Sequence, residues 1–195
     1  MEIRPIGPDL ADDYFALFDN AFTDNPFWAG CYCAFYDVST SNEDWDPSDE
    51  GFGQQNRAYR AEVIDRGDAH GLLAYRDGRP VGWVNAGPRD RYGNLRHFAE
   101  AIEADDPPTG SIMCFVIHPD HRGSQVASSL LAELDDYFRD FGLSQAEAYP
   151  RKAPPNDPDF PWTAAYYKGS PSMYERAGYR AHKKYEYFTS VRKPL

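Results

Sequence analysis

The chain has 195 residues, of which 42% are hydrophobic and 15% aromatic, and its formal net charge at pH 7 is -11. This length suits one domain spanning residues 1–195, the composition excludes a disordered chain, and no apolar run reaches the ~18 residues that cross a bilayer. An acidic surface repels phosphate backbones and anionic lipids, so nucleic acid and membrane partners are disfavoured.

The amino terminus and the cysteines favour a cytoplasmic protein. Residues 1–5 are not followed by the apolar core of a secretory signal. Cys31, Cys33 and Cys114 are an odd set, which argues against a disulfide framework and for a reducing compartment. With His118 they could form a zinc site, but the single residue between Cys31 and Cys33 is tighter than zinc knuckles use. Buried thiols are the preferred interpretation.

The first third of the chain predicts a strand, two helices and an aromatic loop. Glu2–Ile6 should be a strand, and apolar residues at helical spacing from Leu10 to Phe22 indicate an amphipathic helix. A second helix is expected at Gln54–Arg66. Between the helices, residues 25–49 mix Asp, Asn and Ser with many aromatic side chains, which favours a loop that lines a pocket.

Two extended segments around residues 77–78 should pair as a hairpin. Asp77-Gly78 supplies the positive φ angles of a tight turn, so Gly71–Tyr75 and Pro80–Ala86 are expected to run antiparallel. Farther along, the unbroken apolar run within Ser111–His118 is typical of a buried strand.

The long helix that follows is the strongest in the sequence. Its apolar face runs from Val126 to Phe141, and Gly142 ends it. Ser144–Tyr149 returns as a strand, so strand, helix and strand form a crossover with parallel neighbours.

The last 50 residues predict an irregular loop, a short helix and a strand. Prolines crowd the segment 150–161, and long loops of this kind often carry function. Ser170 is expected to cap a helix that ends at Gly178, and one last strand is expected at Tyr179–Val191. Together the elements predict an α/β fold with a mixed, mostly antiparallel sheet flanked by helices.

The junction His118–Ala127, between the buried strand and the long helix, is the clearest candidate binding site. A short turn that leads into a helix amino terminus presents unpaired backbone N–H groups and the positive end of the helix dipole. Such a turn suits phosphate or pyrophosphate, and Arg122 adds a full positive charge. A plain strand-to-helix turn is the alternative interpretation.

At this junction the sequence resembles the GNAT superfamily of acyl-CoA N-acyltransferases. Their signature is Arg or Gln, two residues, Gly, one residue, then Gly or Ala. Arg122 and Ala127 match it, and Gln125 stands where the first glycine is usual. Further landmarks follow in the family's order along nearly the whole chain: Asp77–Trp83, Cys114–Val116, Glu147–Pro150 and Gly169–Tyr179.

The resemblance implies a coenzyme A site in a sheet splayed beside Ser111–His118. Gln125 departs from the pattern because glycine tolerates positive φ more readily. We therefore expect ordinary helical angles at Gln125, with either weaker cofactor binding or a side chain that bonds phosphate. The implied contacts are Arg122 and the backbone N–H groups of Gly123, Ser124, Gln125, Val126 and Ala127 for the pyrophosphate, and main-chain groups of Phe115, Val116 and Ile117 for the pantetheine arm.

The resemblance also implies that Tyr174, four residues before Gly178, protonates the departing thiolate. A phenol titrates near ~10 and a thiol near ~8.5, so the transfer is feasible in a dry site. A core aromatic is the other interpretation of Tyr174. For the general base, Glu147 could face the cleft with a pKa raised by burial, although such a glutamate more often faces solvent or pairs with an arginine.

The function implied is transfer of an acetyl group from acetyl-CoA to a primary amine of a small molecule or peptide, by direct attack in a ternary complex. No metal is expected. Two alternatives stay open, namely a sensor module that binds acyl-CoA without turnover and an interaction domain that binds no coenzyme A. A homodimer is compatible with each. The expected acceptor pocket comprises Trp28, Tyr32, Trp83, Asn85 and Trp162.

Overall fold

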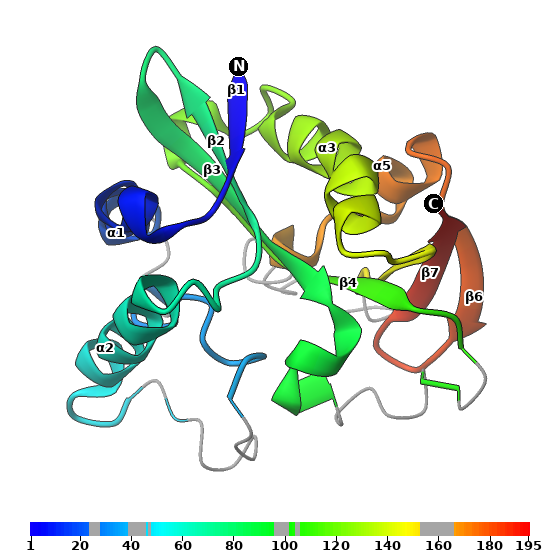
Figure 1. Ribbon diagram of the computed structural model, residues 1–195, viewed down its shortest axis with the longest axis horizontal. Helices are drawn as coiled ribbons and strands as arrows, with labels where there is room; N and C mark the ends of the chain where they lie inside the picture. The colour runs from blue at the N-terminus through cyan, green and yellow to red at the C-terminus, as the bar shows by residue number, and fades with distance from the viewer. Residues whose placement is uncertain (24–27, 39–45, 47, 96–101, 104–105, 153–165) are drawn as a thin grey trace.

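Seven strands form one sheet in the order β1-β2-β3-β4-β5-β7-β6, and every neighbouring pair is antiparallel except β4 and β5 (Figure 1). The computed structural model describes residues 1–195 apart from 24–27, 39–45, 47, 96–101, 104–105 and 153–165. The strands are β1 (Glu2–Pro5), β2 (Leu72–Arg76), β3 (Arg79–Pro88), β4 (Thr109–Ile117), β5 (Gln145–Ala148), β6 (Arg180–Lys184) and β7 (Thr189–Pro194).

Helices cover both faces of this sheet. Figure 1 shows α1 and α2 on one side of β2 and β3, with α3 and α5 on the other. The predicted α/β class, with a mostly antiparallel sheet between helices, is confirmed. The helices are α1 (Ala11–Asn20), α2 (Phe52–Asp65), α3 (Val126–Asp140) and α5 (Pro171–Arg176), and short 3-10 turns are η1 (Pro8–Leu10), η3 (Arg89–Arg91), η5 (Pro119–His121) and η6 (Tyr166–Lys168).

Alternation along the strands divides the core between the two faces. Successive strand side chains point to opposite faces, so neighbours in β2 and β3 join different helices. Burial of these apolar side chains is the main force that holds the layers together. Leu73, Tyr75 and Trp83 pack with α1 and α2, and Leu72, Ala74 and Val84 pack with α3.

Helix α3 lies close to the sheet because glycines face it at two points. A Cβ on Gly82 of β3 would lie 2.5 Å from Cγ1 of Val126, and one on Gly110 of β4 would lie 2.6 Å from Cδ1 of Phe138. Both distances are shorter than real Cβ atoms show. Glycine at these points therefore lets α3 approach β3 near the amino end of the helix and β4 near its carboxyl end.

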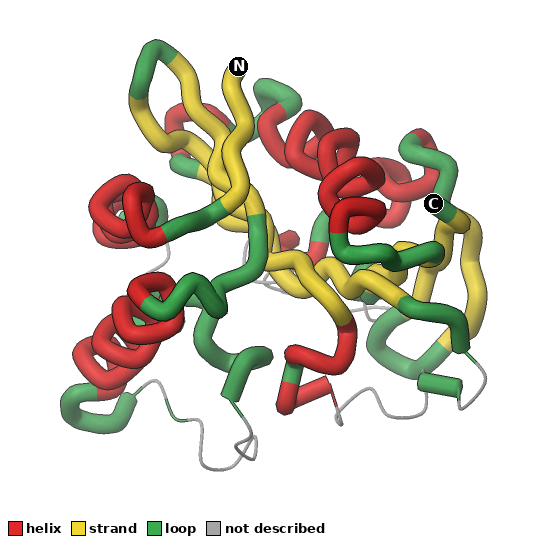
Figure 2. The backbone as a smooth tube through the Cα atoms, viewed as in Figure 1, coloured by secondary structure: helices red, strands yellow, loops and turns green. Residues whose placement is uncertain are grey.

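The hairpin and the crossover follow the predictions. Asp77 and Gly78 have φ of 49° and 72°, as the two-residue turn between β2 and β3 requires. β4, α3 and β5 form the expected unit with parallel strands. Figure 2 shows the strands in two groups that meet where β4 lies beside β5.

The predicted last strand at Tyr179–Val191 is wrong, because this segment is a hairpin of β6 and β7. The Tyr185 N–H donates to the Phe188 carbonyl oxygen and closes the turn. All five residues of β6 are exposed, so the edge strand has no apolar alternation to mark its end.

Candidate functional site

β4 leaves β5 halfway along its length. The ladder between them covers Thr109–Ile112 and Gln145–Ala148, whereas β3 accompanies β4 as far as Ile117. A register shift in the β3–β4 ladder places Met113 as an extra residue, since Asn85 faces Cys114 and Ala86 faces Ile112. Such bulges bend a strand. The carboxyl-terminal half of β4 therefore carries a backbone edge outside the β5 ladder.

The three β4 residues predicted to contact a cofactor lie in this half. Phe115 packs into the core beneath α3, and Val116 packs into the core beneath α1 and α2. Ile117 is partly buried against the α3 side. Their side chains are thus committed to the two hydrophobic layers, so only the main chain of this edge is placed for a ligand.

The loop from β4 to α3 contains two residues in the left-handed region. Gly123 has φ of 72° and Gln125 has φ of 67°. The expectation of ordinary helical angles at Gln125 is wrong. A side chain at positive φ costs roughly 1–2 kcal/mol. Gln125 is the residue directly before α3, and its side chain makes no capping hydrogen bond that would offset this cost. The Gln125 side chain is exposed.

Contacts from the rest of the molecule hold this loop in place. Ser124 donates its hydroxyl to the His121 carbonyl oxygen at 2.6 Å. Nη2 of Arg76, on β2, donates to the Ser124 carbonyl oxygen at 2.7 Å. Arg122 donates to the carbonyl oxygens of Ile117 at 3.3 Å and Ala21 at 3.2 Å. The loop is therefore tied to the hairpin, to β4 and to the end of α1.

Substitutions at Gln125 test the left-handed turn. Gln125→Gly should leave the free energy of unfolding within about 1 kcal/mol of wild type, because relief of strain offsets the added freedom of the unfolded chain. Gln125→Val should lower it by about 2 kcal/mol, because a β-branched side chain tolerates positive φ least. Urea unfolding measures the free energy of unfolding of both variants. Equal stability of the two variants would contradict this backbone geometry.

Tyr174 lies in α5, the short helix that precedes β6. Ser170 caps this helix by accepting from the Met173 N–H at 3.2 Å, as predicted. Tyr174 is fully buried, and its hydroxyl donates to the Lys168 carbonyl oxygen at 2.8 Å. Burial raises the pKa of Tyr174 well above its usual value. The phenol therefore keeps its proton at neutral pH.

Lys168, which the sequence analysis does not single out, lies beside Tyr174 with its side chain inside the protein. It is 2% exposed. Its Nζ lies 3.8 Å from the centroid of the Tyr36 ring and 5.4 Å from that of Tyr167. Burial lowers the pKa of Lys168 to about 7. The only sequence signal for it is a lysine set among tyrosines.

Glu147 is buried in β5 with both carboxylate oxygens engaged. Tyr149 donates its hydroxyl to Oε1 at 2.5 Å, and Arg192 of β7 donates to Oε2. Arg192 also binds Asp106 through two hydrogen bonds of 2.8 and 2.9 Å, and Arg89 binds the Asp106 carboxylate at 2.7 Å. This network joins β5, β7 and the segment before β4. These bonds give Glu147 a structural role, and its role as general base stays a prediction.

Two of the predicted pocket residues, Trp83 and Tyr32, are built into the framework instead of lining a pocket. Trp83 is fully buried, with its ring centroid 5.0 Å from that of Tyr14, so its prediction as a pocket residue is wrong. Tyr32 stacks on Phe18 and donates to Asp19 at 2.7 Å. Both lie where α1 and α2 cover the sheet, which strand alternation alone does not reveal.

Asn85 and Arg60 hold the aromatic loop against the sheet. Asn85 is 1% exposed, accepts from Tyr92 at 2.8 Å and donates to the Cys33 carbonyl oxygen at 3.2 Å. Arg60 is buried in α2, pairs with Asp37 at 2.7 Å and also donates to the Cys33 carbonyl oxygen. Asn85 is thus a positioning residue and not a pocket wall.

The structure brings the aromatic loop next to the segment before α5. Trp28 lies 5.5 Å from Tyr167 between ring centroids, and Tyr36 contacts Lys168. Trp28 therefore keeps its place as a candidate for the acceptor pocket, and Trp162 lies outside the described residues. The thiols of Cys31, Cys33 and Cys114 are free, and burial raises the pKa of Cys31 to about 12. The Cys31 thiol therefore stays protonated at neutral pH.

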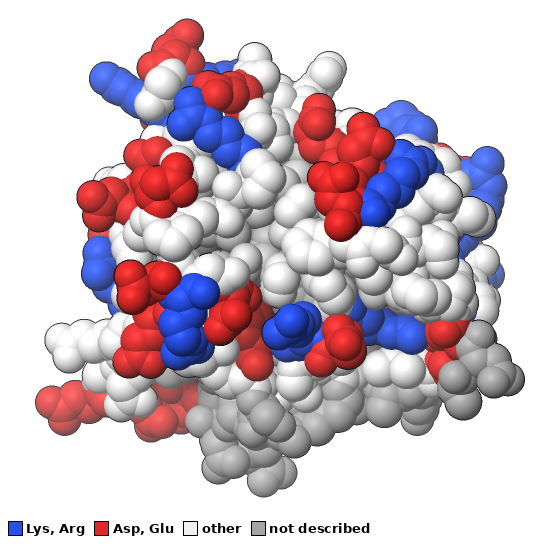
Figure 3. Space-filling model, in the orientation of Figure 1, with Lys and Arg blue, Asp and Glu red and all other residues white. Residues whose placement is uncertain are grey.

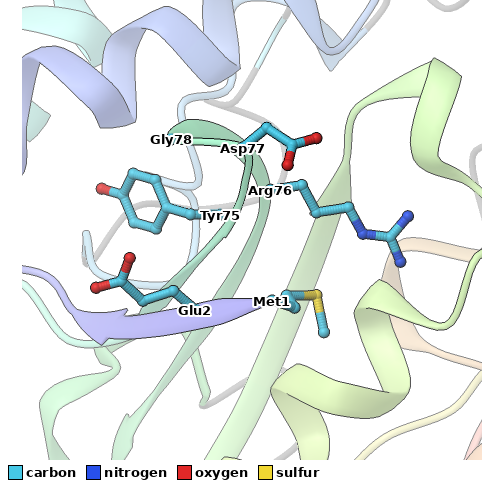
Figure 4. Close-up of a pocket in the computed structure, with 6 residues that line it drawn as sticks. All are labelled: Met1, Glu2, Tyr75, Arg76, Asp77 and Gly78. Carbon is cyan, nitrogen blue, oxygen red and sulfur yellow. The ribbon is translucent and has the colours of Figure 1, made fainter.

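A pocket of about 330 Å³ lies elsewhere, at the tip of the β2–β3 hairpin. Figure 4 shows Arg76 extending away from Tyr75 and Glu2, which lie together on the other side. The charged ends of Glu2 and Arg76 are held by Arg4 and Ser124 respectively. We place no reaction there because its charged groups already serve these contacts.

Acidic side chains dominate part of the surface around the site. Figure 3 shows them over α1, α2 and α3, with mostly uncharged surface between. With a net charge of -11, this distribution attracts cations and repels anions by long-range steering.

The comparison with known families decides the classification. A model of the acetyltransferase (GNAT) family matches residues 35–158, more than half of the chain. The chain belongs to the GNAT family. The matched segment includes β4, the loop before α3 and β5, so it covers the separated strands described above. The resemblance stated from the sequence is confirmed.

Solved GNAT structures share the fold at low sequence identity. The PaiA N-acetyltransferase of Thermoplasma acidophilum, in complex with coenzyme A, is 14% identical, with a TM-score of 0.54 over 100% of this chain and 98% of that one. The ribosomal-protein-alanine N-acetyltransferase of Brucella melitensis is 16% identical, with a TM-score of 0.55 over 100% of both chains. The polyamine N-acetyltransferase of Drosophila melanogaster is 14% identical, with a TM-score of 0.55 over 100% and 99%.

Two further findings concern this GNAT protein as a whole. No protein of curated function matches its sequence. Within the part of the chain that the structure describes, none of its helices has the length and apolar character needed to cross a membrane.

Proposed function

We propose that this GNAT protein transfers an acetyl group from acetyl-CoA to a primary amine. The observation that carries the proposal is the backbone edge of β4, which lies outside the β5 ladder and runs directly into the α3 loop. An extended pantetheine arm can pair with a strand edge, and a helix amino terminus stabilises a pyrophosphate. The two features lie end to end, as one long ligand requires.

The residues present fit acetyl-CoA. Main-chain groups of Phe115, Val116 and Ile117 would hold the pantetheine, and the N–H groups from Gly123 to Ala127 would hold the pyrophosphate. A Cβ on Gly123 would meet no atom within 4 Å, so there is room for a phosphate beside this turn. When bound, acetyl-CoA supplies the activated acetyl thioester.

Tyr174 is the proposed proton donor to the thiolate. Its raised pKa keeps the hydroxyl protonated until a strong base forms beside it. This hydroxyl donates its one proton to the Lys168 carbonyl oxygen, so the O–H must turn from that carbonyl to the sulfur when the thiolate forms. A positioned acid of this kind speeds such a step by roughly 10²–10⁴.

A cationic amine is the proposed acceptor class. The acidic surface concentrates cations, and the aromatic side chains of Trp28 and Tyr167, with ring centroids 5.5 Å apart, offer ring faces to an ammonium group. Support comes also from the fold relatives, which include a polyamine N-acetyltransferase and a ribosomal-protein-alanine N-acetyltransferase.

Calorimetric titration with acetyl-CoA tests the cofactor site. Wild type should bind saturably, and Arg122→Ala should weaken binding at least about tenfold, because the loop loses its ties to Ile117 and Ala21 and a positive charge. Gln125→Gly serves as the matched loop variant and should bind as wild type does. No heat at low or molar KCl would contradict the proposal, and binding without transfer to any amine would indicate a sensor.

A further inference from the structure

Arg76, at the end of β2, is a cation that reaches the proposed cofactor site from outside the family signature. Side chains alternate along a strand, and Leu72 and Ala74 pack on the α3 side, so Arg76 faces α3 as well. Figure 4 shows its side chain extending away from Tyr75. Its Nη2 donates to the Ser124 carbonyl oxygen at 2.7 Å. Arg76 thus contacts the loop before α3 from 48 positions earlier in the sequence.

This hydrogen bond acts on the backbone angle of Gln125. The Ser124 carbonyl belongs to the planar peptide unit that joins Ser124 to Gln125, and the rotation of that unit relative to Gln125 is the φ angle of Gln125. On its other side, the Gln125 carbonyl oxygen accepts the Ser129 N–H of α3 at 3.0 Å. Gln125 therefore lies between two peptide units that are each held by a hydrogen bond, and its φ of 67° satisfies both.

The left-handed angle at Gln125 depends on support from its surroundings. Glycine adopts positive φ readily, whereas a residue with a Cβ does so at a cost in free energy. The Gln125 side chain makes no capping hydrogen bond that would offset this cost. A charged donor forms a stronger hydrogen bond than a neutral one, and the Arg76 guanidinium is such a donor. Strained backbone persists where the surrounding structure holds it, and the Arg76 contact does so here.

The same contact sets the direction of a backbone donor. In a trans peptide unit the C=O and the N–H point in opposite directions. Because the Ser124 carbonyl points to Arg76 on β2, the Gln125 N–H points away from β2. Among the residues that the structure describes, this N–H has no backbone acceptor. A hydrogen bond at the carbonyl also polarises the peptide unit and strengthens its N–H as a donor.

We propose that Arg76 is a positioning residue for acetyl-CoA, an inference that rests on the proposed acetyl transfer. It holds the peptide unit before Gln125 with the N–H turned to the pyrophosphate, and so replaces the conformational freedom that glycine would supply at position 125. Arg122 fixes the start of the loop through the carbonyl oxygens of Ile117 and Ala21, and Arg76 fixes its end.

Calorimetric titration of acetyl-CoA into wild type, Arg76→Met, Gln125→Gly and the double variant tests this role. Arg76→Met should weaken binding about tenfold, because strain then depopulates the left-handed angle at Gln125. The double variant should bind within about threefold of Gln125→Gly, since glycine keeps the angle accessible without the Arg76 contact. Arg79→Met is the matched control. It removes an exposed arginine that pairs with Arg76 across the same hairpin, and it should bind as wild type does.

The double variant separates positioning from attraction between charges. If the Arg76 charge alone attracted the phosphates, Arg76→Met would lose the same factor with glutamine or glycine at position 125. That result, or wild-type affinity of Arg76→Met, would overturn the proposal. At saturating acetyl-CoA, kcat of Arg76→Met with agmatine should stay within about twofold of wild type, because Tyr174 and the β4 edge are unchanged. A fall in kcat with unchanged affinity would also overturn it.

NMR of the unliganded protein gives a readout that does not depend on the cofactor. The three-bond coupling between the amide and α protons of Gln125 reports its φ angle. This coupling should change in Arg76→Met and stay as in wild type in Arg79→Met, and an unchanged coupling in both would contradict the proposal. Absence of acetyl-CoA binding by wild type would overturn the proposed function and this inference together. Binding by wild type with unaffected binding by Arg76→Met would overturn this inference alone.

Discussion

Tyr174→Phe should lower kcat at least about 100-fold, with acetyl-CoA binding unchanged. The substitution removes one oxygen atom from a fully buried side chain and leaves its ring in place. Without the hydroxyl, the thiolate has no positioned proton, and a general acid contributes roughly 10²–10⁴ to such a step. Steady-state transfer to a fixed amine gives kcat, and calorimetry gives the affinity for acetyl-CoA.

Tyr179→Phe is the matched control for this experiment. Tyr179 lies next to Tyr174, with ring centroids 5.3 Å apart, and is also buried. Among the described residues its hydroxyl has no hydrogen-bond partner, so its removal should leave kcat unchanged. Full turnover by Tyr174→Phe, or an equal loss in both variants, would contradict the role of Tyr174 as acid.

Glu147→Gln should lower the free energy of unfolding by about 3 kcal/mol, because it breaks a buried ion pair and leaves Arg192 with only the Asp106 and Glu103 carboxylates. The Glu147 side chain is 0% exposed and that of Arg192 is 12% exposed. Little water can therefore reach Arg192 to replace the lost carboxylate. Urea unfolding at pH 7 measures the change.

Glu103→Gln provides the comparison within the same cluster. Its side chain is 41% exposed, 3.6 Å from Arg192 and 3.0 Å from Lys183. Exposed pairs contribute little, so this variant should unfold at nearly the same urea concentration as wild type. If Glu147→Gln unfolded like Glu103→Gln but abolished acetyl transfer, Glu147 would be a reacting group and its structural assignment would be wrong.

Much of the fold could be predicted because local signals agreed with the global arrangement. The Asp77-Gly78 turn has the predicted positive φ angles, and the apolar face of α3 begins and ends within a residue of its prediction. The sequence did not predict β6 as a separate strand, because an exposed edge strand has no buried face and the turn between β6 and β7 contains neither glycine nor proline. Periodicity reports burial, so it is silent where a strand is exposed.

The candidate site was only partly predictable for a related reason. The loop from β4 to α3 is local in sequence, so its residues could be named, although the angle at Gln125 could not. Lys168 and Glu147 acquire their environments from distant segments: Tyr36 lies 132 positions before Lys168, and Arg192 lies 45 positions after Glu147. Trp83 was misplaced because alternation gives a face of the sheet but not which helix covers it.

The proposed function is tested most directly by amine-dependent acetyl transfer by the wild-type protein. The purified chain is incubated with acetyl-CoA and with agmatine, spermidine or an alanine-terminated peptide, and mass spectrometry detects the acetylated amine. We expect an acetylated product that requires enzyme, acetyl-CoA and amine together, and that Tyr174→Phe reduces. Saturable binding of acetyl-CoA with no product from any amine would contradict it.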